Sequence, residues 1–488
     1  MRVIVIGSGH NGLVCAAMLA RAGHEVDVLE ARSVRGGATR TSEIIPGYRT
    51  STASYSLSLF RPDVWSDLGL GARVQLVRKE PAVSVPYPDG RWLSLRADAA
   101  RTRASIEQIW APDADAYLRW NAFVEGAALA LRPLIDRVEP PTSVEAERIL
   151  GPELWERCVV GSAAETAGAF FASDELRGLV ASQGIVGTQR SVDEPGTAWI
   201  LAYHFFGGEV VGETGAWAYV IGGTGAISAA IADVAREAGA RVQLEAPVAR
   251  ILITDGRAHG VELADGTSLE ADVVVSNAHP VTTFALAGDA PPAVDAWDSS
   301  SRTFKVNLAM RALPRFLNDP DGDACNGTLS FTWGLEHLRA CHVEGATATS
   351  SDPWMEVFIG SSVDPSLVDG EGATLSAFCQ YAGPAPFDGD AAARTVIASL
   401  DRAAPGLADS IVGAQVLGPD ELEREIGLIG GNIFHGELAP PQIFDGRFAA
   451  RSGIDGLYLC GSGTHPGGAI TGAPGRNAAL AVLADRSG

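Results

Sequence analysis

The N-terminal stretch VIVIGSGHNGLVCAAMLARAGHEVDVLE (3–30) constrains the fold of this chain more than any other segment. It opens with the apolar run Val3–Ile6, which predicts a buried strand, and continues through a G-x-G-x-x-G turn at Gly7–Gly12. Small and apolar residues at Leu13–Ala22 predict a helix, and a second strand at Val26–Leu29 ends at an acidic residue. Strand, turn, helix, strand and acid in this order predict a βαβ unit that binds a dinucleotide.

Each part of the turn has a physical role in binding phosphates. Gly7 makes the tight turn, Gly9 leaves room for a pyrophosphate, and Gly12 lets the helix lie close to the sheet. The helix N-terminus offers free N–H groups and the positive end of its dipole. The carboxylate of Glu30 can accept hydrogen bonds from an unmodified ribose, and its charge repels a 2′-phosphate. The residues that we expect to contact the nucleotide here are Gly7, Ser8, Gly9, His10, Asn11, Gly12, Glu30, Ala31 and Arg32.

A second glycine pair bears on the choice between NAD and FAD. Gly36-Gly37 would let the backbone approach the diphosphate from the other side, which is typical of FAD-dependent oxidoreductases and rare in dehydrogenases that use NAD alone. A basic residue and a threonine usually accompany such a pair, and here these would be Arg40 and Thr41. The alternative explanation of the pair is a flexible loop.

The segment 219–251 resembles a second dinucleotide-binding fingerprint, but we do not interpret it as a second nucleotide site. Ser228 stands where the third glycine is needed, and the strand expected at Arg241–Leu244 is not closed by an acid. Its apolar periodicity predicts a helix that ends near Gly239, followed by a strand. In FAD enzymes such a segment returns the chain to the first sheet. A nicotinamide hydride donor is therefore not expected.

Aromatic side chains gather among glycines at 196–220, the stretch GTAWILAYHFFGGEVVGETGAWAYV. Such density predicts the wall of a pocket for an apolar or planar ligand. Plain core packing explains the same residues equally well.

Composition limits the remaining function classes. A chain of 488 residues predicts two domains, and a formal charge of −22 opposes binding to nucleic acid, although it also simply serves solubility. No apolar stretch is long enough for a signal-peptide core or a membrane span, so we expect a cytoplasmic protein and leave contact with a membrane surface open.

No Cys-x-x-Cys pair occurs, so neither a redox disulfide nor a metal site is predicted. The cysteines are Cys15, Cys158, Cys325, Cys341, Cys379 and Cys460.

Taken together, these motifs resemble the phytoene desaturase-like branch of FAD-dependent oxidoreductases, within the carotenoid desaturase and amine oxidase superfamily. The subgroup named for a pyridine nucleotide-disulphide oxidoreductase domain is the most similar. Its most specific matches are GGNIFHGEL (430–438) and GLYLCGSGTHPGGAITGAPGRNAA (456–479). The chain departs from the pattern in the substrate region or at its junction, so a relative's substrate does not carry over. The departures are Tyr203 before His204, Thr224, Pro440-Pro441-Gln442 and Arg447-Phe448.

The resemblance implies an α/β fold in which a Rossmann-like FAD-binding domain carries an inserted α+β substrate domain. The FAD-binding domain would comprise residues 1–90, 220–295 and 440–488, and the substrate domain residues 91–219 and 296–439. Val248 would make backbone hydrogen bonds to the adenine, with an ordinary strand residue as the alternative.

The resemblance also implies that the C-terminal segment completes the FAD site. Gly461 and Ser462 would meet the ribityl chain and the pyrophosphate, and a helix that begins near Gly472-Ala473 would point its N-terminus at flavin N1 and the C2 carbonyl. One cofactor site would then be built from opposite ends of the chain.

Three side chains are candidates for catalysis. His465 could act as an acid or base near the flavin, or only orient its loop, and His204 and Tyr203 are candidates on the substrate face. His435 could also lie near the flavin, with a turn-stabilising role favoured. Hydride abstraction by a flavin needs one weak base or none.

The function implied is an FAD-dependent dehydrogenase or desaturase that passes a hydride from a largely apolar or aromatic small molecule to flavin N5. Electrons would pass on to oxygen, a quinone or another acceptor. The alternatives are a flavin amine oxidase that gives an imine and hydrogen peroxide, and a non-redox protein, either a flavin-dependent isomerase or one that keeps FAD as a structural prop. The substrate and the oligomeric state stay open.

Overall fold

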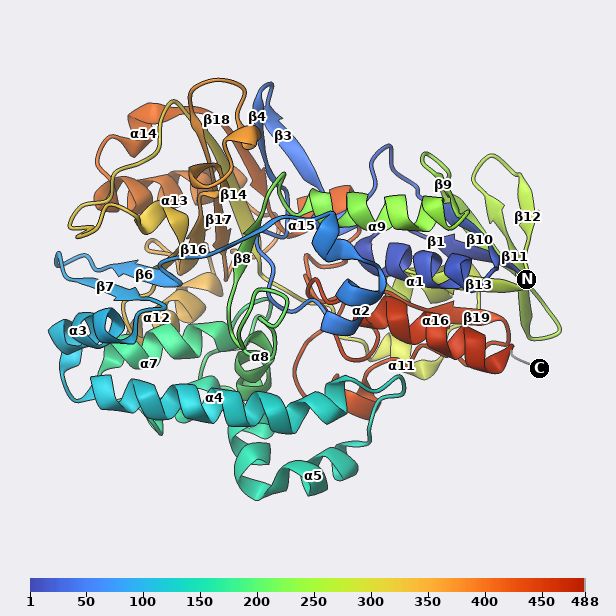
Figure 1. Ribbon diagram of the computed structural model, residues 1–488, viewed down its shortest axis with the longest axis horizontal. Helices are drawn as coiled ribbons and strands as arrows, with labels where there is room; N and C mark the ends of the chain where they lie inside the picture. Colours follow the sequence, from blue (N-terminus) through green and yellow to red (C-terminus); the bar gives the residue numbers. More distant parts are fainter. Residues whose placement is uncertain (487–488) are drawn as a thin grey trace.

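The computed structural model describes residues 1–486 and is built on two separate large sheets, one in each half of the molecule (Figure 1). The first sheet is five-stranded and parallel, and β1 lies at its centre between β2 and β13. In spatial order its strands are β19 (Leu457–Leu459), β13 (Val273–Ser276), β1 (Arg2–Ile6), β2 (Glu25–Leu29) and β9 (Arg241–Gln243). The predicted parallel sheet with a βαβ unit is confirmed.

The five-stranded sheet is covered on both faces. Because successive residues of a strand point to opposite sides, Val3 and Val5 pack against helices, whereas Ile4 and Ile6 pack against an antiparallel sheet. The helices are α1 (His10–Arg21), α9 (Gly225–Glu237) and α16 (Ala473–Asp485). The antiparallel strands are β10 (Val248–Thr254), β11 (Arg257–Leu263) and β12 (Ser268–Glu270).

The second sheet is seven-stranded and mostly antiparallel. In spatial order its strands are β18 (Ile411–Leu417), β14 (Phe304–Met310), β17 (Ala373–Cys379), β16 (Met355–Phe358), β15 (Thr328–Phe331), β6 (Val83–Pro86) and β7 (Trp92–Leu95). A layer of helices lies below this sheet in Figure 1 and shares one apolar core with it. These helices are α3 (Ala99–Trp110), α4 (Asp113–Ile135), α5 (Ser143–Trp155), α6 (Ala163–Gly168), α7 (Asp174–Ala181), α8 (Thr197–His204) and α12 (Leu335–Gly345).

One further long helix, α13 (Gly389–Ala403), packs in the apolar core of the seven-stranded sheet. Shorter elements connect the two halves or cap their edges. They are β3 (Thr41–Ile45), β4 (Tyr48–Ser51), α2 (Pro62–Asp67), β5 (Leu76–Arg78), β8 (Ala218–Val220), α10 (Pro280–Ala287), α11 (Pro292–Asp295), α14 (Leu407–Ser410) and α15 (Pro419–Ile426).

The first helix starts three residues before the predicted Leu13. Its N-cap is Gly9, whose carbonyl accepts the amide of Leu13 at 3.0 Å, so Gly12 lies inside the helix and not in the turn. The segment 219–251 behaves as expected, because α9 is followed by β9, which pairs in parallel with β2.

The division into two domains stays a prediction, although the strands show where it would fall. The proposed boundary at residue 90 lies between β6 and β7, and both strands belong to the seven-stranded sheet. Of the proposed C-terminal part, residues 487–488 lie outside the described residues.

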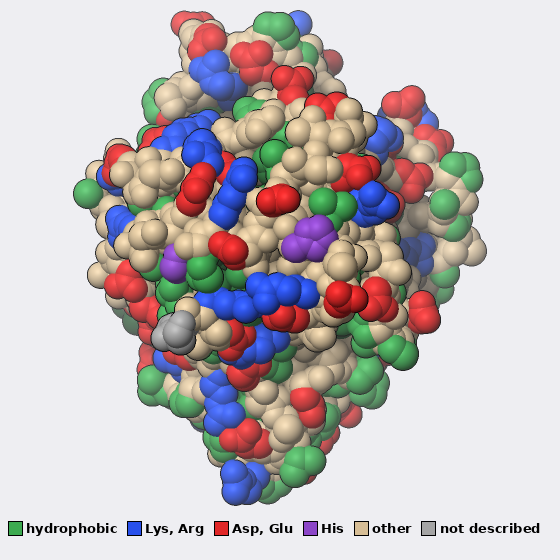
Figure 2. Space-filling view, turned by 90° about the vertical axis from the view of Figure 1, so that its right-hand side faces the viewer, with side chains coloured by type: hydrophobic (Ala, Val, Ile, Leu, Met, Phe, Trp, Pro, Cys, Tyr) green, Lys and Arg blue, Asp and Glu red, His purple; other side chains and the backbone are tan. Residues whose placement is uncertain are grey.

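The surface carries charges of both signs. On the face shown in Figure 2, arginine and carboxylate side chains are interspersed, in keeping with ion pairs such as Arg486–Asp455 at 2.8 Å. Within residues 1–486, none of the helices combines the length and the apolar character that a membrane crossing requires.

Gly475 tests the contact between the first and last helices. A Cβ at this position would lie 2.1 Å from the backbone oxygen of Asn11. We expect Gly475→Ala to lower the free energy of unfolding by ~1–3 kcal/mol, because the two backbones would have to separate. The matched control is Gly126→Ala in α4, where a Cβ meets no atom within 4 Å and stability should stay unchanged or rise by up to ~1 kcal/mol. Urea unfolding followed by circular dichroism measures both, and equal effects would contradict the proposed helix contact.

Candidate active site

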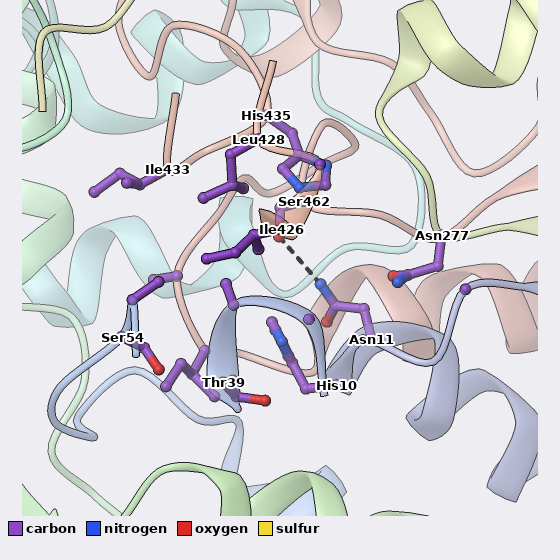
Figure 3. Close-up of a pocket in the computed structure, with 18 of the residues that line it drawn as sticks. His10, Asn11, Thr39, Ser54, Asn277, Ile426, Leu428, Ile433, His435 and Ser462 are labelled. Atoms are coloured by element: carbon purple, nitrogen blue, oxygen red, sulfur yellow. Dashed lines mark hydrogen bonds between the residues drawn. The ribbon is translucent and has the colours of Figure 1, made fainter. Parts of the chain in front are cut away.

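A cavity of about 380 Å³ lies where the carboxyl end of the five-stranded sheet meets the seven-stranded sheet. Its lining comes from segments far apart in the sequence, which Figure 3 shows converging. One end is lined by the turn between β1 and α1 and by the end of β2, and the other end is mainly apolar and aromatic. This is where ligands bind in open parallel sheets.

The side chain of Asn277, just after β13, fixes the glycine turn. Its Oδ1 accepts the backbone N–H of Gly12 at 3.1 Å. A Cβ on Gly9 would lie 2.6 Å from Asn277 Nδ2, and one on Gly12 would lie 2.3 Å from the carbonyl oxygen of Gly7. Gly7 itself has a φ of +91°. Close packing within the protein therefore requires glycine at all three positions, and Gly7 and Gly9 also leave room in the cavity, which they line.

Glu30 is held rigidly at the end of β2. Its Oε2 accepts hydrogen bonds from the backbone N–H and the hydroxyl of Ser8, both at 2.8 Å, and its Oε1 accepts the N–H of Arg32 at 3.0 Å. Glu30, Ala31 and Arg32 line the cavity, whereas Ser8 does not. Ser8 therefore orients the carboxylate and is not itself a cavity residue.

Only some residues around the second glycine pair line the cavity. Gly37 and Thr39 line the cavity, and Gly36 donates its N–H to Ser8 O at 3.0 Å. Arg40 is ion-paired with Glu425 of α15 at 3.0 Å, and Thr41 donates to the carbonyl of Gly222 at 3.0 Å. Neither side chain lines the cavity, because both tie neighbouring segments together instead.

The C-terminal segment reaches the cavity through Ser462. Its hydroxyl accepts a hydrogen bond from Asn11 Nδ2 at 3.4 Å, so the two ends of the chain meet at this point (Figure 3). Val248 also lines the cavity. Three other predicted residues, Gly461, Gly472 and Ala473, lie behind the lining.

Of the three candidate catalytic residues, only His204 lines the cavity. Its Nδ1 lies 2.8 Å from the carbonyl oxygen of Ile200. Burial lowers the pKa of the imidazole to about 4, against the raising effect of the backbones of Ile200 and Gln183. His204 is therefore neutral at physiological pH. Because a carbonyl oxygen only accepts, Nδ1 carries the proton and Nε2 keeps its lone pair.

Tyr203 and His465 are placed elsewhere. The hydroxyl of Tyr203 donates to the carbonyl of Gly468 at 3.2 Å, and burial raises its pKa. The imidazole of His465 lies against the backbone of Leu134 in α4, where burial, followed by the charge of Arg447, lowers its pKa to about 3. Neither side chain lines the cavity, so this placement gives no support to a catalytic role for either.

The inner wall of the cavity is apolar and aromatic. Part of the predicted aromatic stretch lies there, because Trp217 lines the cavity beside His204, whereas Trp199 is buried in the core. Plain core packing thus explains the remainder of that stretch. Residues that the sequence patterns did not single out complete the wall, namely Tyr55, Val186, Phe378, Ile433 and Phe434.

Two buried lysines stand behind this wall. They are the only lysines among the 37 lysine and arginine residues of the chain. Lys305 Nζ donates to the carbonyl of Ala53 at 2.8 Å and lies 5.3 Å from the ring centre of Tyr55. Lys79 Nζ donates to Thr328 Oγ1 at 3.1 Å and lies 4.2 Å from the ring centre of Phe358, which stacks on Tyr55.

Burial changes the charge state of these lysines. It lowers the pKa of Lys305 to about 7, and it also lowers the pKa of Lys79, opposed by the charge of Glu356. Burial raises the pKa of Glu356, which accepts a hydrogen bond from Gln183 Nε2 at 2.7 Å. Unlike an arginine, each lysine can lose its proton near neutral pH.

Comparison with known proteins places the chain among oxidoreductases. Residues 5–68 match the NAD(P)-binding Rossmann-like domain family. Over 99% of its length the chain is 34% identical to pyridine nucleotide-disulfide oxidoreductase domain-containing protein 2 of Rattus norvegicus, of which 93% is covered. It is 28% identical to hydroxyneurosporene desaturase of Cereibacter sphaeroides, over 99% of this chain and 98% of that protein. Cyclohexylamine oxidase from Brevibacterium oxydans shares the fold, with a TM-score of 0.63 and 18% identity over 100% of this chain and 99% of that one.

The low pKa of Lys305 predicts a dependence of stability on pH. Between about pH 7 and the ordinary lysine pKa the unfolded chain binds a proton that the folded chain lacks, so stability rises with pH. One such proton contributes about 1.4 kcal/mol per pH unit. In Lys305→Met the slope between pH 7 and pH 9 should fall by about this amount, as measured by urea unfolding at fixed ionic strength. A variant whose slope equals that of the wild type would contradict the assignment, whatever its absolute stability.

Proposed function

The chain belongs to the family of pyridine nucleotide-disulfide oxidoreductase domain-containing protein 2, among the flavin-type oxidoreductases, and from this premise we propose that it is an FAD-dependent dehydrogenase. It would introduce a double bond into a largely apolar small molecule. The observation that carries this proposal is the mainly apolar and aromatic inner wall of the cavity, with one neutral histidine on it.

The residues at the sheet end of the cavity suit FAD. The turn at Gly7–Gly12 and the N-terminus of α1 would hold the diphosphate, and two buried polar atoms there, His10 Nε2 and Asn11 Oδ1, have no hydrogen-bond partner among the described residues. Glu30 would hold the adenosine ribose, and its fixed carboxylate excludes a 2′-phosphate.

Other predicted contacts complete the cofactor site. Val248 would meet the adenine, Gly37 would approach the diphosphate from the far side, and Ser462 would meet the ribityl chain. Bound FAD would supply the hydride acceptor, N5 of its ring system. The positive end of α16 would favour negative charge nearby, although its first residues lie behind the cavity lining.

His204 is the side chain that we expect to handle a proton. Desaturation removes a hydride from one carbon and a proton from its neighbour, and Nε2 of a neutral imidazole can accept that proton. The contact of Nδ1 with Ile200 holds the ring in place. The aromatic wall around it would exclude water and orient a flat, apolar substrate.

The charges around the inner wall argue against a cationic amine as substrate. Among the described residues that line the cavity, the one carboxylate is Glu30, which lies at the nucleotide end. The buried amines behind the wall belong to Lys79 and Lys305. An alkylammonium ion would lose its hydration here without a counter-charge. Disulfide chemistry, which the family's name suggests, is not part of this proposal, because the sequence contains no Cys-x-x-Cys pair.

The first test is cofactor content. Purified protein should be yellow, and the flavin released on denaturation should co-elute with FAD. Glu30→Ala should weaken FAD binding by about tenfold or more, because buried hydrogen bonds to a charged group contribute roughly 1.5–3 kcal/mol. Glu270→Ala, at an exposed position of β12, should bind FAD normally. A colourless protein that takes up no FAD would refute the proposal.

The second test is anaerobic flavin reduction against a panel of hydrocarbon-like metabolites and primary amines. We expect apolar compounds, not amines, to bleach the flavin. His204→Gln should slow this step by about 10²-fold if it is the base, with FAD affinity retained, whereas Tyr203→Phe should change the rate only slightly. Bleaching by amines with release of peroxide would favour an amine oxidase. Intact FAD that no compound reduces would favour a non-redox role.

A further inference from the structure

Two imidazoles face the nucleotide end of the cavity without a complete set of partners. His10, the first residue of α1, is 8% exposed, and His435 belongs to the loop that follows α15. His10 Nε2 and His435 Nδ1 are buried and have no hydrogen-bond partner among the described residues. In Figure 3 the two rings flank the Asn11–Ser462 hydrogen bond, and both line the cavity.

The groups around this pair are mostly basic. The guanidinium of Arg447 is buried and donates to the carbonyls of Phe434 and Ser462 at 2.6 and 2.7 Å. Within residues 1–486 the guanidinium forms no ion pair within 4.0 Å. Burial lowers its pKa, and the charges of Tyr203 and Glu437 oppose this. Permanent charges on the cavity lining itself are confined to the Glu30–Arg32 corner.

A third imidazole, that of His279, lies 5.4 Å from His435 between ring centres. Its nitrogens are already used, because Nδ1 accepts the N–H of Val281 and Nε2 lies 3.0 Å from Ser299 Oγ. His279 therefore cannot serve a ligand without giving up either the cap of α10 or the contact with Ser299. His10 Nε2 and His435 Nδ1 are therefore the imidazole nitrogens here that have no hydrogen-bond partner among the described residues.

These surroundings disfavour a charged imidazole. Burial lowers the pKa of His10 to about 4, opposed by a hydrogen bond to the backbone of Ala469. Burial also lowers the pKa of His435, and His279, Arg447 and His10 lower it further. Among the described residues no carboxylate raises the pKa of either ring, so both rings are neutral, yet the N-terminus of α1 and Arg447 make the same place attractive to an anion.

We propose that His10 and His435 form a clamp on the diphosphate–ribityl part of FAD, and that the clamp takes up a proton when FAD binds. The inference rests on the proposed FAD site. The diphosphate of FAD, with one negative charge on each phosphate, would give an imidazolium the counter-charge that the protein does not supply here. One buried proton therefore becomes favourable only with the cofactor in place.

The sign of the resulting pH dependence follows from linkage. If the complex binds more protons than the separate protein and FAD, affinity increases as the pH falls through the imidazole pKa of the complex. Cofactor retention would therefore be tighter in mild acid and looser in mild alkali. A site built on arginine would lack this dependence, because a guanidinium keeps its charge throughout.

The experiment is a titration of the apoprotein with FAD by flavin fluorescence quenching at pH 6, 7 and 8 and constant ionic strength. Calorimetry at pH 7 in two buffers of different ionisation enthalpy gives the number of protons taken up. We expect FAD to bind at least about fivefold more tightly at pH 6 than at pH 8, with uptake of a measurable fraction of a proton. His10→Gln and His435→Gln should each flatten this dependence, whereas His259→Gln, in β11 and outside the cavity, should keep it.

The outcomes separate this inference from the proposed function. FAD that binds with the same affinity at all three pH values, and without proton uptake, overturns the clamp and leaves the FAD enzyme standing. A wild-type dependence that survives in both glutamine variants also overturns it. Absence of FAD binding at every pH overturns both proposals. The wild-type measurements decide the question even if a variant fails to fold.

Discussion

The contact between Asn277 and the glycine turn sets the geometry on which the cavity depends. One side chain after β13 accepts the amide of Gly12 and fills the space beside Gly9, so the first turn of α1 has a single position relative to the sheet. The backbone of Asn277 also approaches Gly461, where a Cβ would lie 2.8 Å from its carbonyl oxygen. The start of α1 and the end of β19 are therefore both positioned by the same residue. Loss of this contact would disturb both halves of the proposed cofactor site together.

The cavity combines two electrostatic environments that the fold keeps apart. At the end formed by the glycine turn, backbone dipoles and buried imidazoles favour an anion, and Glu30 is the one carboxylate among the described lining residues. At the inner end, aromatic rings separate the cavity from Lys79 and Lys305, whose burial favours their uncharged forms. The cost of burying polar groups is high in both places, which argues that they are retained for ligand binding or chemistry and not for stability.

Sequence patterns predicted the parts of the structure that depend on local chemistry. The glycine turn, the acid after β2, the rejected second fingerprint and the parallel sheet all follow from residue spacing within short segments. The placement of Asn277 and His279 was missed, because the segment after β13 reaches the cavity only through the pairing of β13 with β1. Thr39 was missed although it lies two residues beyond Gly37. The available signal for Asn277 was an amide side chain just after the apolar run Val273–Val275.

The direction of a side chain was the hardest property to predict. His465 lies in the most specific motif of the chain, yet its ring packs on α4 because the backbone of its loop is held by Phe448 and Asn477. Arg40 and Thr41 follow the expected pattern in sequence but are used for an ion pair and a backbone contact. Spacing identifies residues on the correct loop, whereas long-range packing decides which of them face the cavity.

The burial of both lysines affects which chemical modifications the protein surface can undergo. Every lysine or arginine side chain that solvent meets is a guanidinium, since Lys79 and Lys305 are 2% and 1% exposed. Acetylation, glycation and isopeptide ligation require a primary amine, and the folded surface presents no lysine side chain for any of them. The exterior is in this sense inert to lysine modification, while the interior holds the two lysine amines that can still titrate.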